Sequence, residues 1–297
     1  MLRKLREFDY LEPSSLSEAV SLLDHYGKNA RIFAGGTDLL VTMKKGELNP
    51  RHLINIKGIP GQDYIRYDEK EGLRIGALTT IRQIETSRVI QDGFLPLAQA
   101  ARALGSVQIR NRATIGGNLC NASPSADTAP PLLALDAAVK LVGSQGERVL
   151  PLERFFVGPG STVLDKEILT EIIIPHPALH TQGIYLSISR RRAVDLALVG
   201  VAVVATLDPD KGERKAVKIA LGAVAPTPVR AHHAEKVLEG KSMDAGLIEE
   251  AALIASEKET SCISDVRASD WYRKEMVRVL VQRALEHVSQ ITQEAHR

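Results

Sequence analysis

The stretch RNRATIGGNLCNASPSAD, residues 110–127, carries the pattern from which the fold of this 297-residue chain is predicted. A glycine pair, Gly116 and Gly117, follows an apolar residue. Glycine lets a ligand approach the backbone closely, and successive N–H groups at the start of a helix suit an anion. The loop is therefore a candidate for binding phosphate, and the alternative is a capped loop before an apolar segment. Short side chains that can hydrogen-bond ribose hydroxyls or an adenine edge follow it, namely Asn121, Ser123, Ser125 and Asp127.

An earlier stretch, IFAGGTDLL at residues 32–40, places Gly35 and Gly36 between two apolar runs. Two such loops can clamp one extended ligand, whereas either loop alone fits an ordinary strand-to-helix turn. Asp38 favours a helix start, but it repels an anion unless its side chain points away. The chain contains neither GxxxxGKS/T nor GxGxxG after a strand, so it is neither a P-loop enzyme nor an obvious Rossmann protein.

The composition excludes several classes of function. With 38 basic and 36 acidic residues, the formal charge is +2, which gives no electrostatic case for binding nucleic acid or an anionic membrane. Cys120 and Cys262 are too few for a disulfide framework or for the four thiolates of an iron–sulfur cluster. The first residues lack the apolar core of a secretory signal, and no apolar run approaches the length of a membrane span. We therefore expect a cytoplasmic protein without a metal site.

Hydrophobic periodicity predicts alternating strands and helices in the first half of the chain and strands followed by helices in the second half. The first helix has an N-terminal capping pattern, Ser15 with Glu18, and it ends at Gly27. Strands are predicted at residues 30–33, 51–56, 71–80, 137–144, 148–152 and 167–175, and extended strands within 183–208 and 214–229. Helices are predicted at residues 13–27, 37–46, 81–87, 94–105, about 229–240, 244–257 and 268–291.

Four segments together resemble the FAD-binding medium subunit of the molybdenum hydroxylases, a family that includes carbon monoxide, xanthine and nicotinate dehydrogenases. They are AGGTDLL at 34–40, RNRATIGGNLCNASPSADTAPPLLAL at 110–135, EILTEIIIP at 167–175 and WYRKEMVRVLVQRAL at 271–285. The resemblance covers essentially the whole chain. It implies an α+β protein with a PCMH-type FAD-binding fold of two α/β subdomains, residues 1–57 and 58–177. A C-terminal α+β domain of antiparallel strands and then helices is implied at 181–292.

The resemblance also implies which residues bind FAD. Two loops would clamp the diphosphate, Asp127 would lie at the nucleotide end, and Leu169 would pack on the isoalloxazine ring. No side chain is expected to be catalytic. The implied cofactor-binding residues are Ala34, Gly35, Gly36, Thr37, Asp38, Leu39, Thr114, Ile115, Gly116, Gly117, Asn118, Asn121, Ser123, Asp127 and Leu169.

One segment departs from the family pattern. Relatives often have Tyr-x-Lys before the arginine-rich turn, with the lysine near the flavin ring, whereas this chain has Tyr185, Leu186 and Ser187. A cation beside the ring is therefore absent from this place.

The family resemblance further implies non-covalent FAD and two kinds of partner. A small subunit would carry 2Fe–2S clusters and a large subunit molybdopterin, in a dimer of heterotrimers. Electrons would leave the FAD for NAD, a quinone, ferredoxin or dioxygen. Two alternatives stay open: a stand-alone flavin oxidase or reductase of the same broad fold, and a non-catalytic nucleotide-binding or assembly module.

Overall fold

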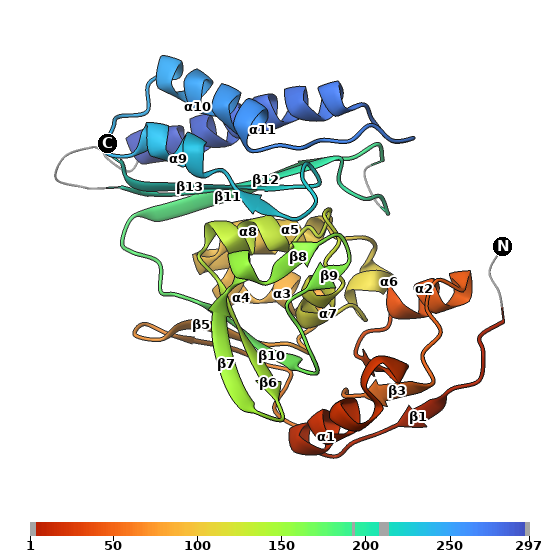
Figure 1. Ribbon diagram of the computed structural model, residues 1–297. Helices are drawn as coiled ribbons and strands as arrows, with labels where there is room; N and C mark the ends of the chain where they lie inside the picture. Colours follow the sequence, from red (N-terminus) through yellow and green to blue (C-terminus); the bar gives the residue numbers. More distant parts are fainter. Residues whose placement is uncertain (1–3, 192–193, 208–213, 295–297) are drawn as a thin grey trace.

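The computed structural model describes residues 4–191, 194–207 and 214–294. Along the chain, three groups of helices and strands follow one another, each with its own sheet (Figure 1). The predicted α+β class is confirmed.

The first group is built on a parallel sheet in the order β1–β3–β2. Helix α1 begins where the Ser15 hydroxyl accepts a hydrogen bond from the Glu18 N–H at 3.2 Å, and it ends at Gly27. Apolar residues of α1, including Val20 and Leu23, are buried against the sheet. The elements are β1 (Asp9–Leu11), α1 (Leu16–Tyr26), η1 (Gly27–Asn29), β2 (Ala30–Phe33), α2 (Leu39–Lys45) and β3 (His52–Asn55).

The second group is built on a five-stranded antiparallel sheet in the order β4–β5–β10–β6–β7. Its strands are β4 (Ile65–Asp68), β5 (Gly72–Gly76), β6 (Ala138–Gly143), β7 (Gly146–Pro151) and β10 (Ile168–Ile174), with the small pair β8 (Phe156–Gly158) and β9 (Ser161–Thr162) beside η2 (Leu152–Arg154). Its helices are α3 (Ile81–Thr86), α4 (Arg88–Gly93), α5 (Leu95–Ala103), α6 (Val107–Arg110), α7 (Ile115–Cys120) and α8 (Ala129–Ala134).

The third group is an antiparallel sheet with helices on both faces (Figure 1). Helices α9 to α11 cover one face, and α5 and α8 of the second group pack against the other. Arg230 Nη1 adds an ion pair with Asp136 Oδ1, at 2.9 Å, between the two groups. The elements are β11 (Thr181–Ile188), β12 (Val199–Leu207), β13 (Arg214–Gly222), β14 (Val229–Arg230), α9 (His232–Leu238), α10 (Ala245–Lys258) and α11 (Asp270–Glu294).

The structure contains elements that the sequence pattern did not predict. Strands β1, β4, β8 and β9 have two to four residues each, and β4 exposes three of its four residues. Such short strands show no run of alternating hydrophobicity, which is the signal on which strand prediction depends. The strands and helices that were predicted all have a counterpart in the structure.

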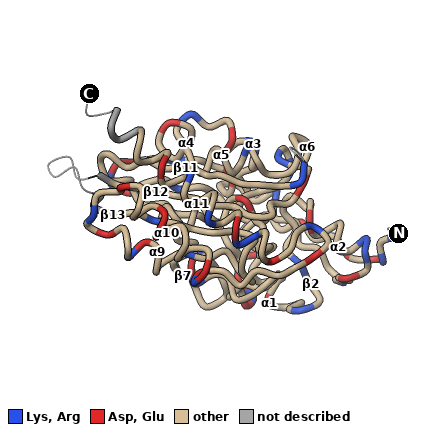
Figure 2. Tube along the Cα trace, turned by 90° about the horizontal axis from the view of Figure 1, so that it is seen from above, with Lys and Arg blue, Asp and Glu red and all other residues tan. Residues whose placement is uncertain are grey.

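The charged residues are dispersed over the molecule. Figure 2 shows basic and acidic residues interspersed along the trace, in keeping with the near-zero formal charge. In the described ranges, no helix is both long enough and apolar enough to cross a membrane.

Candidate cofactor site

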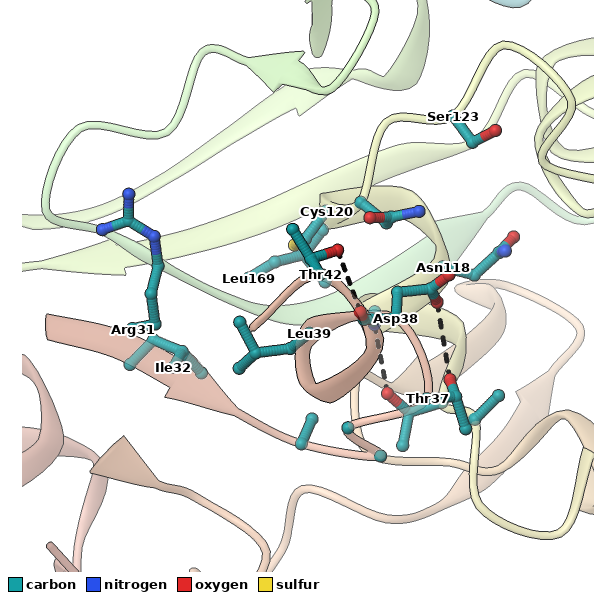
Figure 3. A pocket seen from close by; sticks show the side chains of 18 of the residues that line it. Arg31, Ile32, Thr37, Asp38, Leu39, Thr42, Asn118, Cys120, Ser123 and Leu169 are labelled. Atoms are coloured by element: carbon teal, nitrogen blue, oxygen red, sulfur yellow. Dashed lines mark hydrogen bonds between the residues drawn. The ribbon is translucent and has the colours of Figure 1, made fainter. Parts of the chain in front are cut away.

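A cavity of about 1130 Å³ lies where the first group of elements meets the second. Its walls include both glycine loops and β10 (Figure 3). The segment before β12 also lines it. All of the predicted cofactor-binding residues except Ile115 line it. The structure therefore brings together side chains that lie up to 135 positions apart in the sequence, from Ala34 to Leu169.

The first loop connects β2 to α2. Gly36 has a φ of 75°, and a Cβ there would lie 2.5 Å from the Phe33 ring, so the turn requires glycine. The backbone N–H groups of Gly35, Gly36, Thr37 and Asp38 donate to no group in the described ranges. Since these residues line the cavity, their N–H groups are free to donate to an anion in it.

In the second loop, unlike the first, the backbone N–H groups are already hydrogen-bonded within the protein. The N–H groups of Ile115 and Gly116 donate to the carbonyls of Thr79 and Ala77, both at 3.0 Å. The N–H of Gly117 donates to Thr114 Oγ1 at 3.1 Å, which caps helix α7. These three donors are therefore used within the protein, and the fully buried Ile115 side chain belongs to the core.

Gly117 contributes shape to the cavity instead. A Cβ on it would meet only the Thr114 hydroxyl, at 2.8 Å, and would otherwise enter open space. Because Gly117 lines the cavity, the absence of a side chain leaves room for a ligand to reach the backbone. The two loops also touch, since a Cβ on Gly35 would lie 2.2 Å from the Arg112 carbonyl oxygen.

The polar tail of the second loop lies along the same wall. Asn118 accepts a hydrogen bond from the Thr128 hydroxyl at 2.6 Å, and Ser123 Oγ lies 3.3 Å from Ser125 Oγ. Asp127 is only 8% exposed, and its Oδ1 accepts a hydrogen bond from the Tyr185 hydroxyl at 3.0 Å. Burial raises the pKa of Asp127 to about 6.

Acidic side chains outnumber basic ones around the cavity. Lys166 is paired with Asp24 outside the lining, at 2.8 Å, and burial raises the pKa of Asp38. An anionic ligand would therefore depend on the N–H groups of the first loop rather than on cationic side chains. The acidic lining residues are Asp38, Glu47, Asp127, Asp165, Glu167 and Asp195, and the basic ones are Lys28, Arg31 and Lys166.

Some lining residues were not identified from the sequence. Figure 3 shows Arg31 and Ile32 on β2, Thr42 on α2 and Cys120 at the end of α7. These residues lie in ordinary strands and helices, where no motif distinguishes a side chain that faces a cavity. Burial raises the pKa of the Cys120 thiol to about 12, so this thiol stays protonated at neutral pH.

The family described as "FAD binding domain in molybdopterin dehydrogenase" matches residues 6–177, more than half of the chain. The chain belongs to this family. A second family, described as "CO dehydrogenase flavoprotein C-terminal domain", matches residues 184–288. The resemblance seen in the sequence is thereby confirmed.

Individual relatives of this FAD-binding family match over nearly the full length. The glyceraldehyde dehydrogenase medium chain of Sulfolobus acidocaldarius is 34% identical over 284 residues, which is 95% of this chain and 99% of the relative. The xanthine dehydrogenase FAD-binding subunit of Escherichia coli is 30% identical over 93% of this chain and 94% of the relative. A solved carbon monoxide dehydrogenase from Hydrogenophaga pseudoflava is 34% identical, with a TM-score of 0.92 over 97% of this chain and 99% of that one.

The chain is therefore an oxidoreductase subunit with an FAD-binding domain. The cavity fits this cofactor in three respects. Its volume accommodates an extended dinucleotide, the first loop offers unpaired N–H groups, and Gly117 leaves the opposite wall open to close approach.

Proposed function

We propose that this chain is the FAD-binding electron-transfer subunit of a molybdenum hydroxylase. It would take electrons from the iron–sulfur clusters of a small partner subunit and pass them from FAD to an external acceptor: NAD, a quinone, ferredoxin or dioxygen. Substrate oxidation would take place at the molybdopterin of a large partner subunit. The relatives that support this proposal include a carbon monoxide dehydrogenase medium chain and a nicotinate dehydrogenase FAD-subunit.

The observation that carries the proposal is that two glycine loops touch one another and line one cavity. In this proposal, the N–H groups of residues 35–38 hold the diphosphate, and Gly117 and Asn118 lie on its other side. Asn121, Ser123 and Asp127 hydrogen-bond the nucleotide hydroxyls. Leu169, which is buried on β10 and lines the cavity, packs against the flavin. The subdomain limits 1–57, 58–177 and 181–292 belong to the same proposal.

When bound, FAD supplies the redox chemistry, accepting and releasing single electrons, and the chain supplies orientation and electrostatics. A non-covalent attachment is supported by the Cys120 thiol, whose raised pKa leaves it a poor nucleophile. Neither glycine loop contains another cysteine or a histidine. The chain has only two cysteines, so the iron–sulfur clusters would have to come from a partner. Molybdopterin in a second partner, a dimer of heterotrimers and a cytoplasmic location complete the proposal.

The test is to purify the full chain and record its absorption spectrum, then release the flavin by heat and identify it. FAD in near-equal amount to protein, together with co-purifying iron–sulfur protein, is the expected result. FAD without any iron–sulfur partner would instead support a stand-alone oxidase or reductase. If the folded chain takes up no FAD even after incubation with it, the function is wrong and a non-catalytic module becomes the better interpretation.

A further inference from the structure

A tyrosine of the third group of elements reaches the wall of the cofactor cavity. Tyr185, on β11, is 5% exposed, and its hydroxyl donates to Asp127 Oδ1 at 3.0 Å. The two residues are 58 positions apart, and Asp127 belongs to the second group. Tyr185 itself does not line the cavity, whereas Asp127 does. Any influence of Tyr185 on a ligand therefore passes through the Asp127 carboxylate.

The position of the Tyr185 hydroxyl is fixed from several sides. The Tyr185 backbone N–H donates to Gln99 Oε1 on α5 at 2.7 Å. The ring packs in the core that α5, α8 and the third sheet share. On the neighbouring strand β12, a Cβ at Gly200 would lie 2.7 Å from the Tyr185 hydroxyl, so glycine leaves the space that the hydroxyl occupies.

A buried carboxylate needs hydrogen-bond donors. Asp127 Oδ1 has Tyr185, while no other described side chain donates to this carboxylate. Burial raises the pKa of Tyr185 well above its ordinary value, so the hydroxyl keeps its proton and remains a donor. Tyr185 thus holds one carboxylate oxygen, Oδ1, of a residue that lines the cavity.

We propose that Tyr185 is a positioning residue, which holds the Asp127 carboxylate so that its second oxygen accepts a hydroxyl of bound FAD. This inference rests on the proposed function, because it needs FAD in the cavity. Through Tyr185, the C-terminal part of the chain would contribute to the cofactor site indirectly, because Tyr185 contacts Asp127 and not the cavity itself.

The experiment compares the full chain with Tyr185→Phe, which removes one hydroxyl and keeps the ring. Because the Asp127 carboxylate would no longer be held in place, FAD should bind roughly tenfold more weakly at pH 7.5. The groups that act on the pKa of Asp127 are its burial, which raises the pKa, and hydrogen bonds from Tyr185 and its own backbone, which lower it. Loss of the Tyr185 bond should therefore raise the pKa of Asp127. As the pH falls, the FAD affinity should then begin to decline at a higher pH than in the wild type.

Asp127→Asn completes the cycle. It should weaken FAD binding and remove the pH dependence, and Tyr185→Phe should then produce no shift of the pH profile. Tyr64→Phe is the matched control, because the Tyr64 hydroxyl also donates to a buried carboxylate, Glu171 Oε1 at 2.6 Å, and neither residue lines the cavity. It should leave the FAD affinity and its pH profile unchanged.

Gly200→Ala provides an independent variant in case Tyr185→Phe fails to fold. The added methyl group displaces the Tyr185 hydroxyl while both partners stay in the sequence, so the pH profile should shift in the same direction. An unchanged profile in folded Tyr185→Phe or Gly200→Ala, or an equal change in Tyr64→Phe, would overturn the inference. Failure of the wild-type chain to bind FAD would instead overturn the proposed function.

Discussion

The guanidinium group of Arg110 donates from Nε to Glu85 Oε2 at 2.8 Å, and from Nη1 to the Leu104 carbonyl oxygen at 3.0 Å. Arg110 is 8% exposed and ends helix α6, four residues before Thr114 begins the second glycine loop. Burial raises the pKa of Glu85, but hydrogen bonds from Arg82 and Arg110 outweigh it, and the net pKa lies below its ordinary value. The buried pair therefore anchors the second loop to helix α3.

Arg110→Met should be destabilising, because it removes the buried guanidinium group and leaves the Glu85 carboxylate with the more exposed Arg82 as its remaining partner. Removal of one partner of a fully buried ion pair costs about 3–5 kcal/mol, so the loss here should approach about 3 kcal/mol. Arg82→Met is the control: Arg82 also donates to Glu85, at 3.0 Å, but its side chain is 43% exposed. The loss there should stay below about 1 kcal/mol. Urea unfolding measures both, and equal losses would contradict the anchoring role of Arg110.

Gly35→Ala should separate the two loops. The added Cβ would lie 2.2 Å from the Arg112 carbonyl oxygen and 3.0 Å from the Ala113 Cα, and backbone atoms cannot rotate away. Overpacking of this kind costs about 1–3 kcal/mol. We expect a lower unfolding midpoint together with loss of bound FAD. Gly58→Ala, with no atom within 4 Å of the added Cβ, is the control, and comparable stability of the two variants would show that the loops do not touch as described.

Gly117→Ala should weaken FAD binding while hardly changing the stability of the chain. Its Cβ disturbs the Thr114 cap, which costs about 1 kcal/mol, whereas alanine gains about 1 kcal/mol over glycine inside a helix. Stability should hardly change, but the methyl group occupies ligand space, and FAD affinity should fall by at least about tenfold, equivalent to about 1.4 kcal/mol. Gly93→Ala, at the end of helix α4 with open space around the added Cβ, should leave the FAD affinity unchanged and gain up to about 1 kcal/mol of stability. Full FAD retention by Gly117→Ala would place the ligand elsewhere.

The sequence predicted the parts of this site that depend on local chemistry. Glycine pairs between apolar runs mark both loops, and Ser15 with Glu18 marks the start of α1, because each pattern reflects a backbone requirement within a few residues. The sequence could not show that the N–H groups of Ile115 and Gly116 are already used. Their acceptors, on Thr79 and Ala77, lie far back in the chain and meet the loop only in the tertiary fold.

The same limit applies to Tyr185. Its place beside a missing lysine drew attention to the flavin environment, whereas its contact with Asp127 arises from the packing of the third sheet against α5 and α8. Long-range pairs of this kind leave no periodic signal, because each residue alone fits an ordinary buried position.

Asp127→Asn should stabilise the flavin-free chain at neutral pH. The pKa of Asp127 is about 6 in the folded chain, against 3.8 as its ordinary value. Between these pH values the folded state binds more protons than the unfolded state, so the contribution of this group to stability falls as the pH rises from about 4 to 6. Above pH 6 the buried carboxylate costs up to about 3 kcal/mol, at about 1.36 kcal/mol per pKa unit. Asparagine carries no charge and can still accept the Tyr185 hydrogen bond, so it removes this cost.

Urea unfolding of both flavin-free chains from pH 4 to pH 8 measures this difference. The stability advantage of Asp127→Asn should grow from pH 4 to pH 6 and then stay constant, while its FAD affinity at pH 7.5 remains below that of the wild type. A carboxylate that lowers the stability of the free chain but strengthens ligand binding is expected at a functional site. A pH-independent difference between the two chains would show that Asp127 is ionised in the folded state throughout this range, and would remove the energetic case for its role in the cavity.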